Sequence, residues 1–173
     1  MKTTHLALLF FTLTSFSRAE YGPWIDADNN CLDTRQEVLV AESLDDVVIR
    51  GCEVISGKWL DNYTGKYYTS PKKLDIDHLV PLAEVDKSGG SKWPRSKKIA
   101  YANDLENRET LIAVSASQNR AKGDKDPSKW LPANKAYHCQ YAKDWLKVKK
   151  TWQLEIDDKE QKALDKILAS CQN

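Results

Sequence analysis

Polar side chains at three places along the chain have the types that bind a hard metal ion and move a proton. Asp77 stands beside His78, and two asparagines, Asn107 and Asn119, follow later in the chain. Carboxylate and amide oxygens are hard ligands that suit Mg²⁺ or Mn²⁺ rather than a closed zinc site. A histidine whose pKa lies near neutrality can take a proton from water without itself binding the metal. Together these groups could neutralise a phosphate and activate a water molecule.

Each of these residues also has a structural interpretation when it is read alone. An Asp-His pair can close a strand, Asn107 can be a turn residue, and Asn119 can be a surface position of a helix. Their order along the chain favours the chemical interpretation. Asp75 alternates with Asp77 on one strand face, and we interpret it as an acid that supports the metal ligands rather than as a strand-edge charge.

A strand, a second strand and a helix are the elements that must position these side chains. The alternating apolar residues of 74–80 predict the first strand, and the apolar run 111–114 predicts the second. A short helix over 118–122 then ends at Gly123, a residue type favoured just after helices. Such a strand–strand–helix unit can bring Asp77 and His78, at the end of the first strand, close to Asn119 on the helix.

The segments around this unit alternate between helix and strand patterns, which predicts an α+β domain with little regular sheet. The chain has 173 residues, one domain's worth, and we expect a single domain over 20–173 with its core at about 74–125. The other predicted elements are a helix from Asp33 or Thr34 to about Ser43, a strand at 47–49, a hairpin at 57–68, a helix from Pro94 to about Asn103, and two terminal helices at 136–150 and 158–170.

The chain begins with the features of a secretory signal peptide. Lys2 is followed by an apolar segment too short to span a bilayer, and a small-x-small ending precedes Glu20. We expect cleavage after Ala19, and hence a signal peptide over 1–19; the alternatives are a buried N-terminal helix or an anchor. No later stretch is apolar enough to cross a membrane, so the mature protein is expected to be secreted or periplasmic and free of the membrane.

Four cysteines support export, because an even number in an oxidising compartment favours disulfides. No pair has the Cys-x-x-Cys spacing of a zinc knuckle. Cys139 and Cys171 lie at similar distances from the turn between the two terminal helices, so an antiparallel pair brings them level. Of the three connectivities we favour Cys139–Cys171, and Cys31–Cys52 then follows by exclusion. His138, beside Cys139, is expected to be structural.

The whole chain carries nearly equal numbers of basic and acidic residues, but the two kinds are unevenly distributed along the sequence. Residues 87–150 hold 15 Lys and Arg against 6 Asp and Glu, whereas residues 20–86 hold 6 against 14. A basic segment beside an acidic one suits a polyanionic partner, although lysine-rich solvated helices are also common.

The three polar points and their surroundings resemble the HNH endonucleases, also called the ββα-metal or His-Me finger family. The resemblance lies in the sequences of Asp75–Pro81, Asn107 and Ser117–Asp124. These sequences are similar to those of the HNH nuclease domain of RNA-guided CRISPR effectors. More extensively the chain resembles the small exported HNH-family proteins of bacteria. In those proteins further segments also recur, namely those at 49–52, 57–59, 101–105 and 126–132 and the terminal helix pair.

The resemblance implies a ββα-metal core with an N-terminal helix and hairpin and a disulfide-linked helical pair at the C-terminus. It implies that Asp77 and Asn119 bind the metal. His78 would be the general base, and Asn107 would orient the loop that carries it. Asn119 stands where the family name has its last histidine, which favours Mg²⁺ or Mn²⁺ over a tightly held transition metal.

Several basic residues are candidates for contacts with nucleic acid. Lys122 lies one helical turn from Asn119 and can approach the same phosphate, or it is a solvated lysine beside a helix end. The further candidates, for each of which a surface charge is the simpler interpretation, are Arg95, Lys97, Lys98 and Arg120.

From these observations we expect an exported, metal-dependent endonuclease that acts on double-stranded DNA. Low sequence specificity is expected because no base-reading module such as a zinc finger is present, so that affinity would come from phosphate contacts. One alternative is a non-catalytic secreted nucleic-acid-binding module on the same fold. Another is a nuclease toxin, which would have an immunity protein as its partner.

Overall fold

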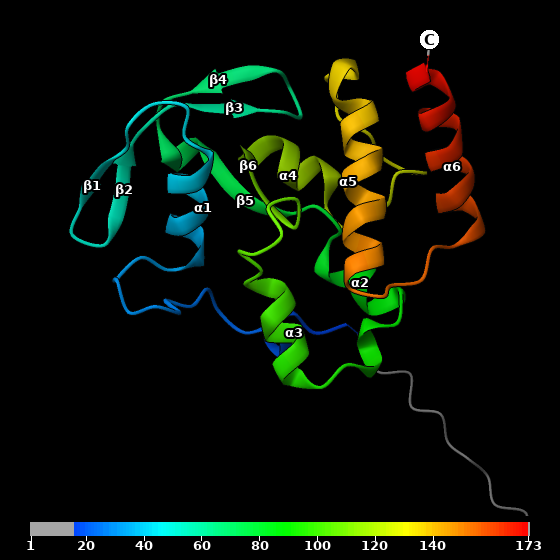
Figure 1. Ribbon diagram of the computed structural model, residues 1–173, viewed down its shortest axis with the longest axis horizontal. Coiled ribbons are helices and arrows are strands. Elements are labelled where there is room, and N and C mark those ends of the chain that lie inside the picture. Colours follow the sequence, from blue (N-terminus) through cyan, green and yellow to red (C-terminus); the bar gives the residue numbers. More distant parts are fainter. Residues whose placement is uncertain (1–15, 173) are drawn as a thin grey trace, which may run out of the picture.

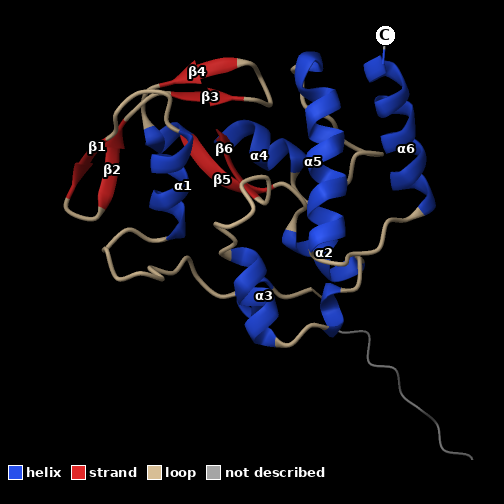
Figure 2. Cartoon of the chain, viewed as in Figure 1, coloured by secondary structure: helices blue, strands red, loops and turns tan. Residues whose placement is uncertain are grey.

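The computed structural model describes residues 16–172, so that most of the predicted signal peptide lies outside the described part. Its strands pair as three separate antiparallel two-stranded sheets, β1–β2, β3–β4 and β5–β6. This confirms a mixed α+β fold with little regular sheet (Figures 1 and 2). The elements are α1 (Thr34–Glu42), β1 (Val48–Arg50), β2 (Glu53–Ser56), β3 (Trp59–Asp61), β4 (Lys66–Tyr68), β5 (Leu74–His78), α2 (Leu82–Lys87), α3 (Arg95–Ala102), β6 (Leu111–Ser115), α4 (Ala116–Lys122), α5 (His138–Thr151) and α6 (Asp158–Ala169).

The strand–strand–helix unit predicted from the sequence lies at the centre of the molecule. β5 pairs with β6 from Leu74 opposite Ser115 to His78 opposite Leu111, and α4 follows β6 directly. Figure 1 shows α1 and the two other hairpins on one side of this unit and α5 and α6 on the other. Gly123 ends α4 with a positive φ of 57°, as the sequence indicated.

Two apolar clusters hold this unit, one on each face of the β5–β6 pair. Along β6, Leu111 and Ala113 belong to the cluster under α1, whereas Ile112 and Val114 belong to the cluster under the C-terminal helices. Asp75 and Asp77 pair with Val114 and Ile112. Both aspartates therefore point toward α4 and the C-terminal helices, and their surroundings are set by that side of the sheet.

The N-terminal helix begins where its capping residue predicts. The side chain of Asp33 accepts a hydrogen bond from the backbone N–H of Gln36 at 3.0 Å, and Val38 and Leu39 are the buried positions of α1. In contrast, α2 was not predicted from the sequence. It has only six residues after Pro81, too few to display a helical period, and its burial comes from Leu82 and Val85.

Both predicted disulfides are present, with Cα–Cα distances of 5.2 Å for Cys31–Cys52 and 5.7 Å for Cys139–Cys171. The first ties the segment before α1, residues 20–33, here called the N-terminal arm, to the β1–β2 turn. The second ties the start of α5 to the short 3-10 helix Ser170–Gln172 that follows α6. His138 has a structural contact, because its Nε2 lies 2.7 Å from the carbonyl oxygen of Pro132.

Within residues 16–172 no helix has the length and apolar character needed to cross a bilayer.

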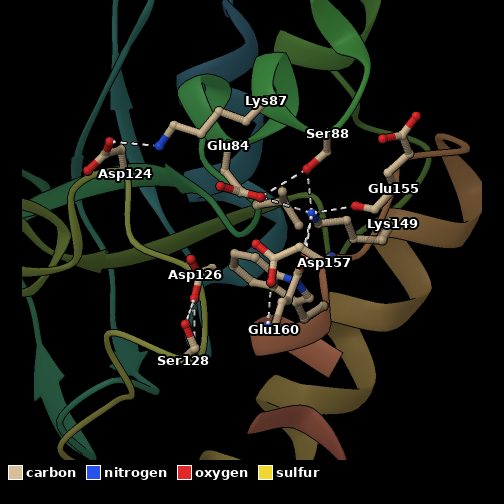
Figure 3. A network of polar contacts seen from close by, with 12 residues as sticks. Glu84, Lys87, Ser88, Asp124, Asp126, Ser128, Lys149, Glu155, Asp157 and Glu160 are labelled. Carbon is tan, nitrogen blue, oxygen red and sulfur yellow. Dashed lines mark hydrogen bonds and ion pairs between the residues drawn. The ribbon is translucent and has the colours of Figure 1, made fainter. Parts of the chain in front are cut away.

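A buried ion-pair network joins α2 to the C-terminal helices (Figure 3). Nζ of Lys149 on α5 lies 3.1 Å from Glu84 of α2 and 3.1 Å from Glu160 of α6, and it donates to Ser88 Oγ at 2.6 Å. All four side chains are buried. Since α2 follows β5 after a short turn, this network fixes the downstream end of the Asp-His segment against the helical pair.

Replacing Lys149 with methionine should lower the free energy of unfolding by about 3–5 kcal/mol, because Glu84 and Glu160 would remain buried without a counter-charge. The matched control is Lys150→Met at the next, exposed position of α5, which should change stability by less than about 0.5 kcal/mol. Urea unfolding of the two variants measures the difference. Equal stabilities would contradict the contribution assigned to the network.

Candidate active site

A cavity of about 460 Å³ opens beside the end of β5 and the start of the N-terminal arm. Its lining includes the side chains that the sequence singled out on β5 and α4, namely Asp75, Asp77, His78 and Asn119. Phe16 and Arg18, which belong to the predicted signal peptide, also line it. The strand–strand–helix unit therefore brings three of the four predicted site residues to one cavity, and Asn107 is the one that lies outside it.

The imidazole of His78 is held in one orientation by α3 and the N-terminal arm. Nε2 lies 3.0 Å from the carbonyl oxygen of Ala102, the last residue of α3. Because a carbonyl only accepts, Nε2 carries the proton and donates, and Nδ1 keeps a lone pair. The rings of Trp24 and Tyr101 stack on the imidazole with centroids 5.4 Å and 5.8 Å away. These contacts select one tautomer and restrict rotation of the ring.

The protonation of His78 differs from the sequence-based expectation of a pKa near neutrality. The pKa of His78 is lowered to about 3, chiefly by burial and to a smaller extent by the nearby charges of Arg18 and Lys122. The hydrogen bond to Ala102 opposes this shift. The imidazole is therefore neutral at pH 7 with a lone pair at Nδ1, although so low a pKa makes it a weak base. Removal of Arg18 with the signal peptide would remove one of the charges that lower this pKa.

Asp77 is buried and its carboxylate is already engaged. Lys122 Nζ lies 2.8 Å from Oδ1 and 2.7 Å from Oδ2, and the Tyr63 hydroxyl donates to Oδ2 at 2.6 Å. The same ammonium donates to the carbonyl of His78 at 2.9 Å. Burial raises the pKa of Asp77 and lowers that of Lys122, and the attraction between the two charges opposes both shifts. The ion pair joins α4 to the end of β5.

Asn119 contacts Asp75 rather than Asp77. Its Nδ2 lies 3.2 Å from Asp75 Oδ2, and both side chains are half-buried in the cavity lining. Rotation of the amide by 180° exchanges its nitrogen and oxygen, so the pair can offer a carboxylate and an amide oxygen together. Those are the donors that a hard divalent cation prefers. In residues 16–172 no cluster of three His, Cys, Asp or Glu side chains forms a ready metal cage.

Asn107 holds the loop that joins α3 to β6. Its Nδ2 donates to Asp104 Oδ2 at 3.0 Å, and the Thr110 hydroxyl donates to the same oxygen at 2.7 Å. The loop begins directly after Ala102, the residue whose carbonyl receives the His78 hydrogen bond. Asn107 is therefore connected to the histidine through the backbone of this loop and not through the cavity.

The predicted nucleic-acid contacts are placed in different environments. Lys122 is fully buried with its ammonium on Asp77, so its predicted approach to a phosphate is not available in this arrangement. Lys98 is likewise buried, and it pairs with Glu20 and lies 3.5 Å from Asp86. Both lysines are buried because each forms ion pairs with acidic side chains inside the protein. Among the other candidates, Lys97 lies over the ring of Trp93, and Arg95 and Arg120 are exposed outside the cavity lining.

Sequence reasoning missed several groups around the histidine. Trp24 belongs to the segment before α1, for which the sequence predicted no element, yet Asn103 Oδ1 accepts a hydrogen bond from the N–H of Ile25 at 3.0 Å and holds this segment in place. Tyr63 lies in the predicted hairpin, where an aromatic residue gives no sign of a contact with Asp77. Arg35 of α1 carried no signal at all, because a single arginine early in a helix is an ordinary surface residue.

The sequence of the chain is similar to one protein family and to one secreted protein. Residues 32–167 match the family model described as GmrSD restriction endonucleases, C-terminal domain. The chain is 38% identical over 156 residues to an uncharacterized secreted protein of Arthroderma benhamiae, an alignment that covers 90% of this chain and 76% of that relative. No solved structure matches the chain. Together with the two disulfides, the secreted relative confirms the predicted export.

Proposed function

Because the chain belongs to the family described as GmrSD restriction endonucleases, C-terminal domain, we propose that it is an exported endonuclease of the HNH type. The unit of β5, β6 and α4 would be its ββα-metal core. One observation carries the proposal: a single cavity holds a neutral His78 with a lone pair at Nδ1 together with the oxygen donors Asp75 and Asn119. Those are the parts that phosphodiester hydrolysis requires.

His78 is the general base in this proposal. Nδ1 takes the proton of the attacking water, and the resulting positive charge is shared with the Ala102 carbonyl through Nε2–H. Trp24 and Tyr101 keep the ring from turning away. Asn107 acts as a positioning residue, because the loop that it closes through Asp104 sets the place of that carbonyl.

The donors present fit a hard cation such as Mg²⁺ or Mn²⁺, and Asp75 and Asn119 would hold it. When bound, the cation neutralises charge on the phosphate and on the leaving oxygen. Asp77, the ligand expected from the sequence, would have to give up Lys122 and Tyr63 first. We therefore assign Asp77 to the internal ion pair that holds α4 on β5.

The substrate proposed is double-stranded DNA, cleaved with low sequence specificity. The basic segment 87–150 contributes a positive field, and contacts to phosphates read no bases. Affinity should therefore fall steeply as the salt concentration rises.

The proposal is tested by incubating the oxidised chain from Glu20 onward with supercoiled plasmids of unrelated sequence and with a matched RNA. Mg²⁺, Mn²⁺ and Ca²⁺ are compared with EDTA. We expect nicked and then linear DNA with Mg²⁺ or Mn²⁺, and intact DNA with EDTA. Intact plasmid and intact RNA under every condition would leave only a non-catalytic binding module, whereas cleavage of RNA alone would correct the substrate.

A further inference from the structure

Arg35 of α1 brings a permanent positive charge to the proposed active site. Among the described residues that follow the predicted signal peptide, it is the only Lys or Arg in the lining of the cavity, which it shares with Asp75, His78 and Asn119. A guanidinium stays protonated at any pH relevant to the protein. Once Arg18 has been removed with the signal peptide, Arg35 is therefore the remaining side-chain cation of this cavity.

The guanidinium is anchored through one of its nitrogens. Nη2 donates to the carbonyl oxygens of Pro71 at 3.1 Å and Leu74 at 2.9 Å. Leu74 is the first residue of β5, the strand that ends at His78. These bonds use two of the five guanidinium donors, and within residues 16–172 Nη1 and Nε have no hydrogen-bond partner. The group is thus fixed relative to the histidine and retains donors for another ligand.

The charges around the cavity favour an additional positive charge for a bound phosphate. Three carboxylates line it, and two of them have lysine partners, Asp77 with Lys122 and Asp124 with Lys87. Asp75 has an amide partner, and no lysine or arginine among residues 16–172 pairs with it. The proposed cation would attract a phosphodiester to this place, and Arg35 adds a second, permanent positive charge that does not depend on the metal.

We propose that Arg35 binds a nonbridging oxygen of the phosphodiester that is cleaved, an inference that rests on the proposed endonuclease function. Nη1 and Nε remain as donors for a phosphate oxygen while Nη2 holds the backbone carbonyls, and such charge-assisted bonds strengthen as negative charge develops in the transition state. Arg35 then takes the role that the sequence gave to Lys122, whose ammonium is committed to Asp77. In this assignment Arg35 touches substrate and is a catalytic residue.

The test separates this cavity from the rest of the DNA-binding surface by using a small diester, bis(p-nitrophenyl) phosphate, with Mn²⁺. Arg35→Gln should lower kcat/KM by about 10²–10³-fold, the loss typical of removing one donor to a developing anion. Arg35→Lys keeps the charge but has a single nitrogen, which cannot hold the backbone carbonyls and a phosphate as the guanidinium can, and kcat/KM should fall about tenfold. Arg50→Gln, a change of an exposed arginine at the end of β1 outside the cavity lining, is the matched control and should leave hydrolysis of the small diester unchanged.

Two further readouts distinguish substrate binding from a purely structural role. The Mn²⁺ affinity by titration calorimetry and the unfolding midpoint of Arg35→Lys should stay close to those of the wild type, because lysine can still donate to the Pro71 or Leu74 carbonyl. If the wild type hydrolyses the diester and both Arg35 variants do so equally well, this inference is wrong while the endonuclease remains. If the wild type cleaves neither DNA nor the diester, the proposed function fails and takes the inference with it.

Discussion

His78→Ala should lower the rate of DNA cleavage by about 10²–10⁴-fold, the contribution of a positioned general base. The variant removes Nδ1, the nitrogen that the Ala102 contact leaves with a lone pair. Binding of Mn²⁺ should stay close to that of the wild type, because the proposed ligands Asp75 and Asn119 remain in place. Initial rates on supercoiled plasmid and Mn²⁺ titration calorimetry measure the two effects separately.

The chain offers a matched control in His138→Ala, which removes an imidazole that bonds to the Pro132 carbonyl and does not line the cavity, and which should leave the rate unchanged. A second check uses the slot between Trp24 and Tyr101 that His78→Ala vacates. Added imidazole should restore part of the lost rate by occupying that slot. A His78→Ala rate equal to that of His138→Ala would remove His78 from the chemistry.

Asp75→Asn and Asp77→Asn should separate metal binding from folding. Asp75→Asn should weaken Mn²⁺ binding by at least about tenfold with little loss of stability, because Asp75 is half-buried and contacts an amide. Asp77→Asn should lower the free energy of unfolding by about 3–5 kcal/mol, because it leaves the Lys122 ammonium buried without its counter-charge. Calorimetry with Mn²⁺ and urea unfolding are measured on both variants.

The paired change Asp77→Leu with Lys122→Met is the control for the ion pair. It removes both charges together and should recover most of the stability lost in Asp77→Asn. If Asp77→Asn weakens Mn²⁺ binding and Asp75→Asn does not, then Asp77 is the metal ligand expected from the sequence. Lys122 would then have to leave the carboxylate when the metal binds.

Local patterns were enough to predict most of the elements around the site. The Asp33 cap, the alternation before His78, the apolar run of β6 and the glycine after α4 are signals that act within a few residues. The disulfide between Cys139 and Cys171 was predicted because the two cysteines lie at similar distances from the turn between two antiparallel helices. Such features depend on backbone periodicity and capping, which tertiary contacts here reinforce.

The partners of the site side chains could not be predicted in the same way. Asp75 and Asp77 share one strand face, so spacing cannot tell which carboxylate meets Lys122 and which meets Asn119. The low pKa of His78 arises from burial, to which Trp24 contributes from a distant part of the chain. Arg35 reaches the cavity only because α1 packs beside the first residue of β5. Each of these contacts is long-range, and no single segment encodes it.

The most direct test of the proposed function is a time course of plasmid cleavage by the chain from Glu20 onward with Mn²⁺, run beside the same protein in EDTA and beside His78→Ala. We predict that only the wild type with Mn²⁺ converts supercoiled plasmid to nicked and linear forms at an appreciable rate. Supercoiled plasmid that persists in all three reactions, or that disappears equally fast with wild type and His78→Ala, would contradict a metal-dependent endonuclease with His78 as its base.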